Sequence, residues 1–205
     1  MSRYRDPLLR AAFDLQSRLY NIVEQSFLTD YYSSEDAEAR HYACENTLYV
    51  IAEYLGWVEI LRREVRFLDL GDELSNRKWV LRVDAIRHTL LTDDYEPVLR
   101  LFNGQQRAIG EIMAEPAANA AQAGEGRLQC IGYAAFVARQ SDPEFARWFA
   151  QMRTDVGVLA GEPEGHLDRV VALQHELVEL IDFLDPEHTR LPPYDREKLV
   201  RVASS

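Results

Sequence analysis

The chain lacks most of the motifs from which recognisable active sites are built. It has 2 cysteines, Cys44 and Cys130, which belong to no CxxC motif and no Cys/His zinc spacing. It has no Gly-x-Ser-x-Gly nucleophile motif, and the segment from Gly104 to Gly110 lacks the glycine spacing and the Lys-Ser/Thr of a phosphate-binding P-loop. Two isolated cysteines are typical of a reducing compartment, so we expect a cytoplasmic protein.

Positive charge is also scarce. The 205 residues include 23 Lys and Arg against 34 Asp and Glu, which gives a formal net charge of −11. The basic residues are dispersed, and the tightest group, Arg62, Arg63 and Arg66, is interleaved with acidic residues. Because nucleic-acid binding needs a basic face that neutralises phosphates, we expect no nucleic-acid partner. The acidic balance also disfavours direct contact with anionic lipids.

Long apolar runs are missing as well. The N-terminal sequence MSRYRDPLLRAAFDLQ has no apolar run of the kind found in signal peptides. The most apolar stretch of the chain is interrupted by Glu53 and Glu59, so it does not have the composition of a membrane-spanning helix. The sequence therefore predicts that this chain has no membrane span.

The strongest positive signal is helical periodicity before Gly71. The main apolar stripe recurs at steps of three and four residues and consists of Leu48, Ile51, Tyr54, Leu55, Val58, Leu61, Val65 and Leu68. At 100° per residue, Tyr49, Ile60 and Phe67 form a second apolar stripe outside the first. A helix that faces water on one side needs a single stripe. The sequence therefore predicts a long helix at about 35–70 that lies centrally, with packing partners on two sides.

Further helices are expected on both sides of this one. The same periodicity predicts helices at about 7–28, about 75–92, 129–140, 143–160 and 164–184. The Asn103-Gly104 pair resembles a hairpin turn, but helix formers follow it, so we favour two short helices within 95–113. The small, polar segment 114–127 is typical of a flexible loop.

These elements together predict an all-α helical bundle in one domain over residues 1–185. Residues 1–94 and 164–185 would supply the bundle helices, and residues 95–160 would form a region of short helices beside them. Residues 186–205, with three prolines, would be a C-terminal tail.

The chain does not match the pattern of carboxylate-bridged di-iron bundles. Such sites need Glu-x-x-His on two helices, and this chain offers only His-x-x-x-Glu, at His41/Glu45 and His175/Glu179. These pairs are more typical of solvent-facing ion pairs, so we expect no metal and no cofactor. Without a nucleophile or an acid–base set, no residue is predicted to be catalytic.

The second stripe of the long helix gives the first candidate site. Tyr49, Ile60 and Phe67 share their side with Glu53, and Trp57 lies at its edge. In one interpretation the stripe packs beneath region 95–160. In the other it is part of a surface for a protein partner or a second copy of the chain, since aromatic residues are enriched at interfaces.

The second candidate is a small-molecule pocket between the bundle and region 95–160. Its expected lining is Glu53, Trp57, Arg107, Glu111 and Tyr133. Arg107 and Glu111 are also spaced as a helix-stabilising i,i+4 ion pair, which is the simpler interpretation of those two residues.

Four stretches carry a resemblance to a group of uncharacterised bacterial proteins, mostly actinobacterial. The stretches are RDPLLRAAFDLQSRLYNIV, LYVIAEYLGWVEILRREVRFLDLG, LFNGQQRAIGEIM and CIGYAAFVARQSDPEFARWF. The resemblance covers about residues 5–185 and carries no activity, ligand or catalytic residue. Some members of the group have an N-terminal membrane-anchoring segment, which implies a cytosolic domain beside a membrane.

Two functional hypotheses follow. The first is a non-enzymatic protein-interaction or scaffold module that works with a protein partner or as a homo-oligomer, as the cytosolic part of a membrane-associated system. The alternative is a small-molecule-binding or hydrolytic helical protein that uses the predicted pocket.

Overall fold

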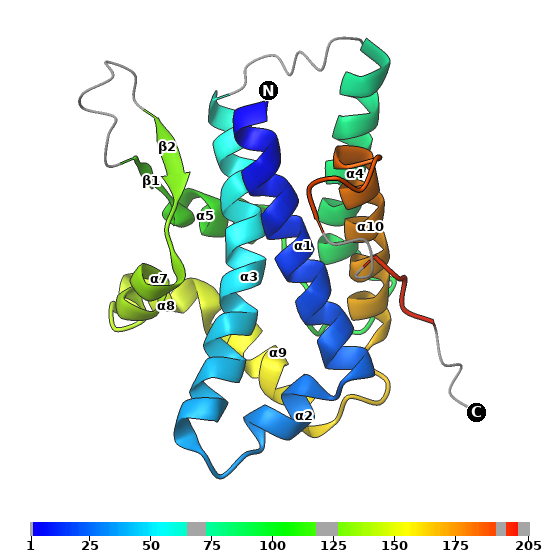
Figure 1. Ribbon diagram of the computed structural model, residues 1–205. Coiled ribbons are helices and arrows are strands. Elements are labelled where there is room, and N and C mark those ends of the chain that lie inside the picture. The colour runs from blue at the N-terminus through cyan, green and yellow to red at the C-terminus, as the bar shows by residue number, and fades with distance from the viewer. Residues whose placement is uncertain (1, 65–72, 118–126, 192–195, 201–205) are drawn as a thin grey trace.

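The computed structural model describes residues 2–64, 73–117, 127–191 and 196–200 (Figure 1). Its helices are α1 Ser2–Glu24, α2 Phe27–Tyr32, α3 Ala37–Glu64, α4 Glu73–Leu91, α5 Asn103–Met113, α7 Tyr133–Arg139, α8 Pro143–Ala146, α9 Ala150–Gly161 and α10 Asp168–Leu184. A short 3₁₀ turn, η1 Arg147–Phe149, joins α8 to α9, and two strands, β1 Ala114–Pro116 and β2 Leu128–Cys130, form a small sheet. The predicted all-α bundle is confirmed.

Four long helices, α1, α3, α4 and α10, run side by side as the bundle (Figure 1). Close packing joins α3 to α1, α1 to α10, and α10 to α4. No comparable contact joins the described parts of α3 and α4, and α5 packs against both of them instead. The bundle therefore has one open seam, which is bordered by α3, α4 and α5.

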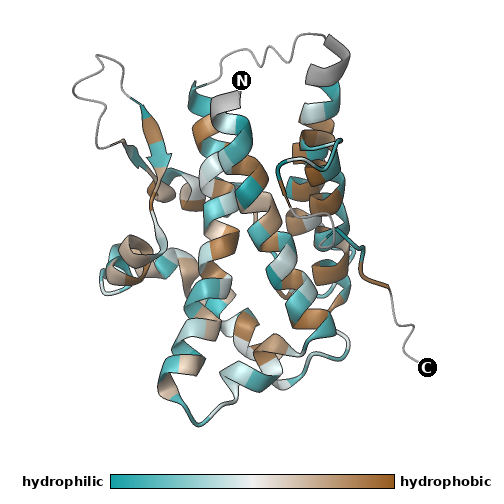
Figure 2. Ribbon diagram, viewed as in Figure 1, coloured by the Kyte–Doolittle hydropathy of each residue, from teal (hydrophilic) through white to brown (hydrophobic). Residues whose placement is uncertain are grey.

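Helix α3 is the centre of the fold. It packs against α1, α2, α5, α7, α9 and both strands. Leu48 and Ile60, from the two predicted stripes, are both fully buried. Figure 2 shows brown and teal segments alternating along α3 and its neighbours, as expected for helices that bury part of their surface. The predicted range extended to residue 70, and residues 65–70 lie outside the described part of the chain.

Two glycines allow α5 and β2 to approach α3 closely. A Cβ atom on Gly110 of α5 would lie 2.7 Å from the backbone oxygen of Leu55. A Cβ atom on Gly56 of α3 would lie 2.8 Å from the Cys130 sulfur and 2.9 Å from the Met113 Cβ. Only glycine fits at such separations, so these two positions fix how α5 lies beside the seam.

The prediction of one helix at 7–28 is wrong at both ends. Helix α1 begins at Ser2 and contains Pro7, so Pro7 does not open it. The helix ends at Glu24, because Ser26 adopts a left-handed conformation with φ of 50° that an α-helix does not accommodate. The chain restarts as α2, which packs against α3 and α9 and buries Leu28.

The prediction of two short helices in 95–113 is also wrong, because only α5 forms. Residues 95–102 cross the bundle as an irregular segment, in which Leu99 has a φ of 56°. Arg169 of α10 donates to the backbone oxygens of this segment, including Val98 at 3.0 Å. Asp155 of α9 accepts from the Leu99 N–H at 2.9 Å. These distant side chains satisfy backbone groups that a helix would have satisfied internally.

The prediction of a flexible loop over 114–127 is wrong in part. Its first residues pair with the chain beyond it as antiparallel strands, with Ala114 opposite Cys130 and Pro116 opposite Leu128. The short helix predicted from 129 consequently starts at Tyr133. Residues 118–126 lie outside the described part of the chain.

The C-terminal segment packs onto the bundle. The carboxylate of Asp185 accepts from the N–H groups of Thr189 and Leu191 and from Arg196, whose Nη2 lies 2.5 Å from Oδ2. Gln174 of α10 accepts from the Leu199 N–H at 3.1 Å. In the part of the chain that the structure describes, no helix has the length and apolar character needed to cross a bilayer.

Candidate functional site

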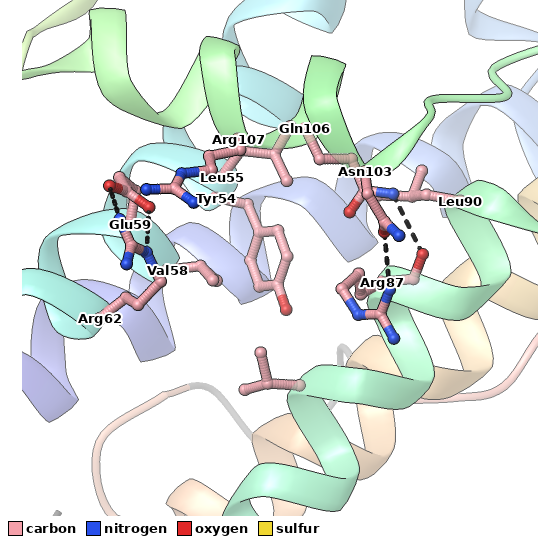
Figure 3. A pocket seen from close by; sticks show the side chains of 11 residues that line it. Tyr54, Leu55, Val58, Glu59, Arg62, Arg87, Leu90, Asn103, Gln106 and Arg107 are labelled. Atoms are coloured by element: carbon pink, nitrogen blue, oxygen red, sulfur yellow. Dashed lines mark hydrogen bonds and ion pairs between the residues drawn. The ribbon is translucent and has the colours of Figure 1, made fainter. Parts of the chain in front are cut away.

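A pocket of about 230 Å³ occupies the seam between α3, α4 and α5 (Figure 3). Its apolar lining comes from Tyr54, Leu55, Val58, Val83 and Leu90. Its polar lining consists of Glu59, Arg62, Arg87, Asn103, Gln106 and Arg107. The pocket is therefore an apolar cavity with a charged rim, which is the usual composition of a small-molecule site.

Tyr54 is the most unusual residue of this pocket. The residue is 2% exposed, and its hydroxyl has no hydrogen-bond partner. In Figure 3 the ring stands between Val58 and Arg87, and the hydroxyl points away from α5 into the space between α3 and α4. Burial raises the pKa of Tyr54 far above its ordinary value, so the phenol is neutral and can donate or accept one hydrogen bond. Buried polar groups without a partner are rare in folded proteins.

The wall opposite α3 is held by polar contacts between α4 and α5. The Gln106 side chain is buried and donates to the backbone oxygens of Leu101 at 2.8 Å and Arg87 at 3.1 Å. Asn103 accepts from Arg87 at 2.6 Å. The two bonds that involve Arg87 are drawn in Figure 3, and they join α4 to α5 at this wall of the cavity.

The rim on the α3 side is a chain of ion pairs. Glu59 is 4% exposed and accepts from Arg62 at 2.7 Å and from Arg63 at 2.5 Å. Arg63 also lies 3.5 Å from Glu111, which pairs with Arg107 at 3.0 Å. Burial by itself would raise the pKa of Glu59, but the hydrogen bonds from Arg62 and Arg63 outweigh it and lower the pKa. Glu59 is thus a charged anchor that holds the arginines at the mouth.

The residues predicted from sequence do not gather in one place. Arg107 lines the rim of the seam pocket and Glu111 pairs with it. Tyr49 and Glu53 line a different hollow, between α1 and α3. Phe67 lies outside the described residues.

The two described residues of the second stripe, Tyr49 and Ile60, pack against other parts of the chain. Ile60 is fully buried, and Trp57 packs half-buried against the core. The Tyr49 ring meets Phe136 of α7 at 5.5 Å and Tyr133 of α7 at 5.3 Å between ring centroids. For Tyr49 and Ile60 this packing favours the interpretation in which the stripe lies beneath region 95–160.

Sequence reasoning did not select Tyr54, Val83 or Arg87 as site residues. Tyr54 belongs to the main apolar stripe of α3 and has the same pattern as a core residue such as Leu55. No signal in the sequence shows that one hydroxyl in that stripe lacks a partner, because the partners would have to come from other helices.

The histidine–carboxylate pairs considered as metal ligands are bound elsewhere. Glu45 is buried against Arg153, and the Nε2 atom of His175 lies 2.7 Å from the Leu199 oxygen. Glu179 pairs with Arg82 at 2.7 Å and with Lys198 at 2.5 Å. Within the described residues, no three His, Cys, Asp or Glu side chains are grouped so that they could hold a metal ion.

Comparison of the chain with protein-family models, curated proteins and solved structures gave no match. The resemblance to the actinobacterial group stays a prediction, and the function is argued from the geometry above.

Proposed function

We propose that this protein binds a compact small molecule in the pocket between α3, α4 and α5. The ligand would have an apolar body, one hydrogen-bonding group for Tyr54 and one acidic group for the arginine rim. The observation that carries the proposal is the fully buried Tyr54 hydroxyl, which has no partner in the protein and points into the cavity. A ligand that supplies the missing hydrogen bond would offset about 1–3 kcal/mol of desolvation.

The volume sets the size of the ligand. An apolar cavity of about 150 Å³ accepts benzene. The seam pocket, at about 230 Å³, has room for one ring with a short side chain. Pockets for larger ligands have volumes of roughly 300–1,000 Å³. We therefore expect a molecule of the size of a small aromatic or branched aliphatic acid.

The rim favours an acid over a base. Arg62, Arg87 and Arg107 line the mouth, whereas Glu59 is the one acidic residue of the described lining. The side chains of these arginines are 51%, 42% and 60% exposed, and each already contacts a carboxylate. The Arg87–Asp84 and Arg107–Glu111 pairs are exposed on both sides. Such pairs contribute only about 0–1 kcal/mol, so Arg87 or Arg107 can exchange its partner for a ligand carboxylate at little cost.

Binding without a covalent step is the simpler function for this lining. Serine, threonine, cysteine and histidine are absent from the described lining of the pocket. The hydrolytic form of the alternative hypothesis would need a free nucleophile or base, and the Glu59 carboxylate of this lining is already bonded to Arg62 and Arg63. The protein-interaction hypothesis stays a prediction.

Three related probes test the proposal by isothermal titration calorimetry on the full chain. para-Hydroxyphenylacetate carries a ring, an acid and a hydroxyl, phenylacetate lacks the hydroxyl, and para-hydroxyphenylethanol lacks the acid. We expect the first to bind most tightly and each of the others about tenfold more weakly, the factor that corresponds to one lost hydrogen bond.

Tyr54→Phe is the decisive variant. It should bind para-hydroxyphenylacetate and phenylacetate with equal affinity, because it lacks the hydroxyl that distinguishes them. Tyr4→Phe is the matched control, since the Tyr4 hydroxyl donates to Glu64 at 3.0 Å outside the pocket. This control should keep the preference. The proposal fails if none of the three probes binds or if Tyr54→Phe keeps the preference.

A further inference from the structure

A second hollow, of about 330 Å³, lies between α1 and α3 on the other side of α3 from the seam pocket. Helix α1 lines it with Asp14 and Arg18 among others, and α3 lines it with Asn46, Tyr49 and Glu53 among others. At 100° per residue these α3 positions point away from Tyr54, Val58 and Arg62. The two cavities are therefore independent, and the lining of this one is mainly polar.

Arg18 is the central residue of this hollow. It is 8% exposed, and its Nη1 atom is buried without a hydrogen-bond partner. Its Nη2 atom donates to the Asn46 side chain at 2.5 Å, and its guanidinium stacks 3.8 Å from the Phe27 ring centroid. Among the described residues no carboxylate forms an ion pair with Arg18. Arg18 thus lines the hollow as a buried arginine whose charge is met by the Phe27 and Tyr42 rings and by no carboxylate.

Negatively charged side chains lie at the other end of the hollow. Asp14 and Glu53 line the hollow from α1 and α3, and each carboxylate raises the energy of the other's charged form. Partial burial raises the pKa of Glu53, a hydrogen bond from Tyr49 lowers it, and the charge of Asp14 raises it again. Two carboxylates that disfavour each other's charge are a suitable site for a cation placed between them.

The helices place these two ends apart along the hollow. Asn46, which holds Arg18, and Glu53 are seven residues apart on α3, which corresponds to roughly 10 Å along a helix. A ligand that contacts both ends must carry a negative and a positive group separated by a few ångströms. From the unpartnered Arg18 nitrogen and the facing carboxylates of Asp14 and Glu53, we infer that this hollow binds a small zwitterion of the amino-acid type. Its carboxylate lies on Arg18 and its ammonium lies between Asp14 and Glu53.

A series of amino acids of increasing length tests the inference directly. Glycine, beta-alanine and gamma-aminobutyrate are titrated into the full chain while NMR follows the Arg18 side chain and the backbone amides of α1 and α3. Butyrate and butylamine are the matched controls, because each keeps one charge of gamma-aminobutyrate and lacks the other. We expect saturable binding of at least one zwitterion, and binding of the two controls that is at least about tenfold weaker.

Variants at both ends sharpen the result. Arg18→Met and the pair Asp14→Asn with Glu53→Gln should each weaken zwitterion binding at least about tenfold, while Arg147→Met, an exposed arginine far along the chain, should leave it unchanged. If Arg18→Met does not fold, the carboxamide pair still tests the site. The inference is overturned if no zwitterion binds, if the singly charged controls bind equally well, or if the carboxamide pair binds as the wild type does. None of these results depends on the seam pocket.

Discussion

Arg169 of α10 and Arg18 of α1 are both buried arginines on bundle helices, but their surroundings differ. Every guanidinium nitrogen of Arg169 donates to a backbone oxygen, with Val98 at 3.0 Å, Thr89 at 2.5 Å and Thr92 at 2.9 Å. Arg18 donates to the Asn46 side chain and packs on the Phe27 and Tyr42 rings, and its Nη1 atom has no hydrogen-bond partner. Arg169 therefore organises the chain between α4 and α5, whereas Arg18 lies at a cavity with unused capacity.

The same contrast separates the surroundings of α10 from those of α3. Gln174 and Asp185, at α10, are buried and bonded to several groups each. Of the buried atoms without a protein partner, Tyr54 Oη and Arg18 Nη1 belong to residues that line the two cavities on either side of α3. The Nε atom of Arg196, beside Asp185, also lacks a partner, but Arg196 lines neither cavity. Satisfied buried polar groups indicate a structural role, and unsatisfied ones beside a cavity indicate a place for a ligand.

The largest expected effect is the stability difference between the two arginine variants. Arg169→Met should lower the free energy of unfolding by about 3–5 kcal/mol, because several buried carbonyls lose their donor. Arg18→Met should lower it by about 1 kcal/mol or less, since one hydrogen bond is lost and the side-chain volume is kept. Urea unfolding followed by circular dichroism measures both. Equal losses in the two variants would break the comparison.

The pH dependence of stability tests whether the hydrogen-bonded carboxylate of Asp185 stabilises the fold. Burial by itself would raise the pKa of Asp185, but hydrogen bonds from Arg196 and from the N–H groups of Arg190 and Thr189 outweigh it and lower the pKa. A group with a lowered pKa stabilises the fold at pH values above its ordinary pKa of about 3.9. This stabilisation is lost as the pH falls through the pKa of the folded state.

Asp185→Asn should therefore destabilise the protein by about 2–3 kcal/mol at neutral pH. The difference from the wild type should shrink as the solution becomes acidic. Urea unfolding across the acidic range measures the change, and a difference that is independent of pH would show that the charge of Asp185 contributes nothing.

A substitution at Tyr54 tests whether its buried hydroxyl lacks a hydrogen-bond partner in the free protein. Tyr54→Phe removes a buried hydroxyl that has no partner, so the ligand-free protein should become more stable by about 1 kcal/mol. In Tyr4→Phe the lost hydroxyl donates to Glu64, so no gain is expected there. Thermal unfolding of both variants without added probe measures the difference. A loss of stability in Tyr54→Phe would mean that its hydroxyl is satisfied in the free protein.

The smallest expected effect concerns Glu53, which faces Asp14 from α1, Tyr49 on α3 and Cys130 from β2. Its raised pKa means that the folded protein binds a proton more readily than the unfolded chain does, so its ionised form destabilises the fold as the pH rises through that value. Glu53→Gln should thus be slightly more stable than the wild type at neutral pH, by less than about 1 kcal/mol. The gain should vanish in acid. Thermal unfolding at two pH values measures it, and a gain that persists in acid would contradict the charge argument.

Particular elements show how much of the fold can be predicted from the sequence. The ranges predicted for α3 and α4 match the structure closely over their described residues, because a 3.6-residue apolar repeat is a local property. The prediction of one helix at 143–160 is wrong, because this range is divided into α8, η1 and α9. The sequence did not predict the break at Ser26, the irregular segment 95–102 or the strands at Ala114 and Leu128. Each of these is fixed by packing or hydrogen bonds with other parts of the chain.

The candidate sites depend even more on contacts that the sequence does not reveal. Arg107 and Glu111 were predicted as an i,i+4 pair and form one at 3.0 Å. Tyr54 and Arg18 gave no signal, because a stripe tyrosine and an arginine on an amphipathic helix are ordinary residues until their neighbours are known.

The sequence by itself determined that this chain is helical and that α3 is buried on two sides. Helix formation and face burial depend on residues within about two turns of one another. Only the tertiary structure decided which buried groups find partners. The donor Arg169 and its acceptor Val98 are 71 positions apart in the chain, and no local pattern could show that Arg169 is satisfied while Arg18 and Tyr54 are not.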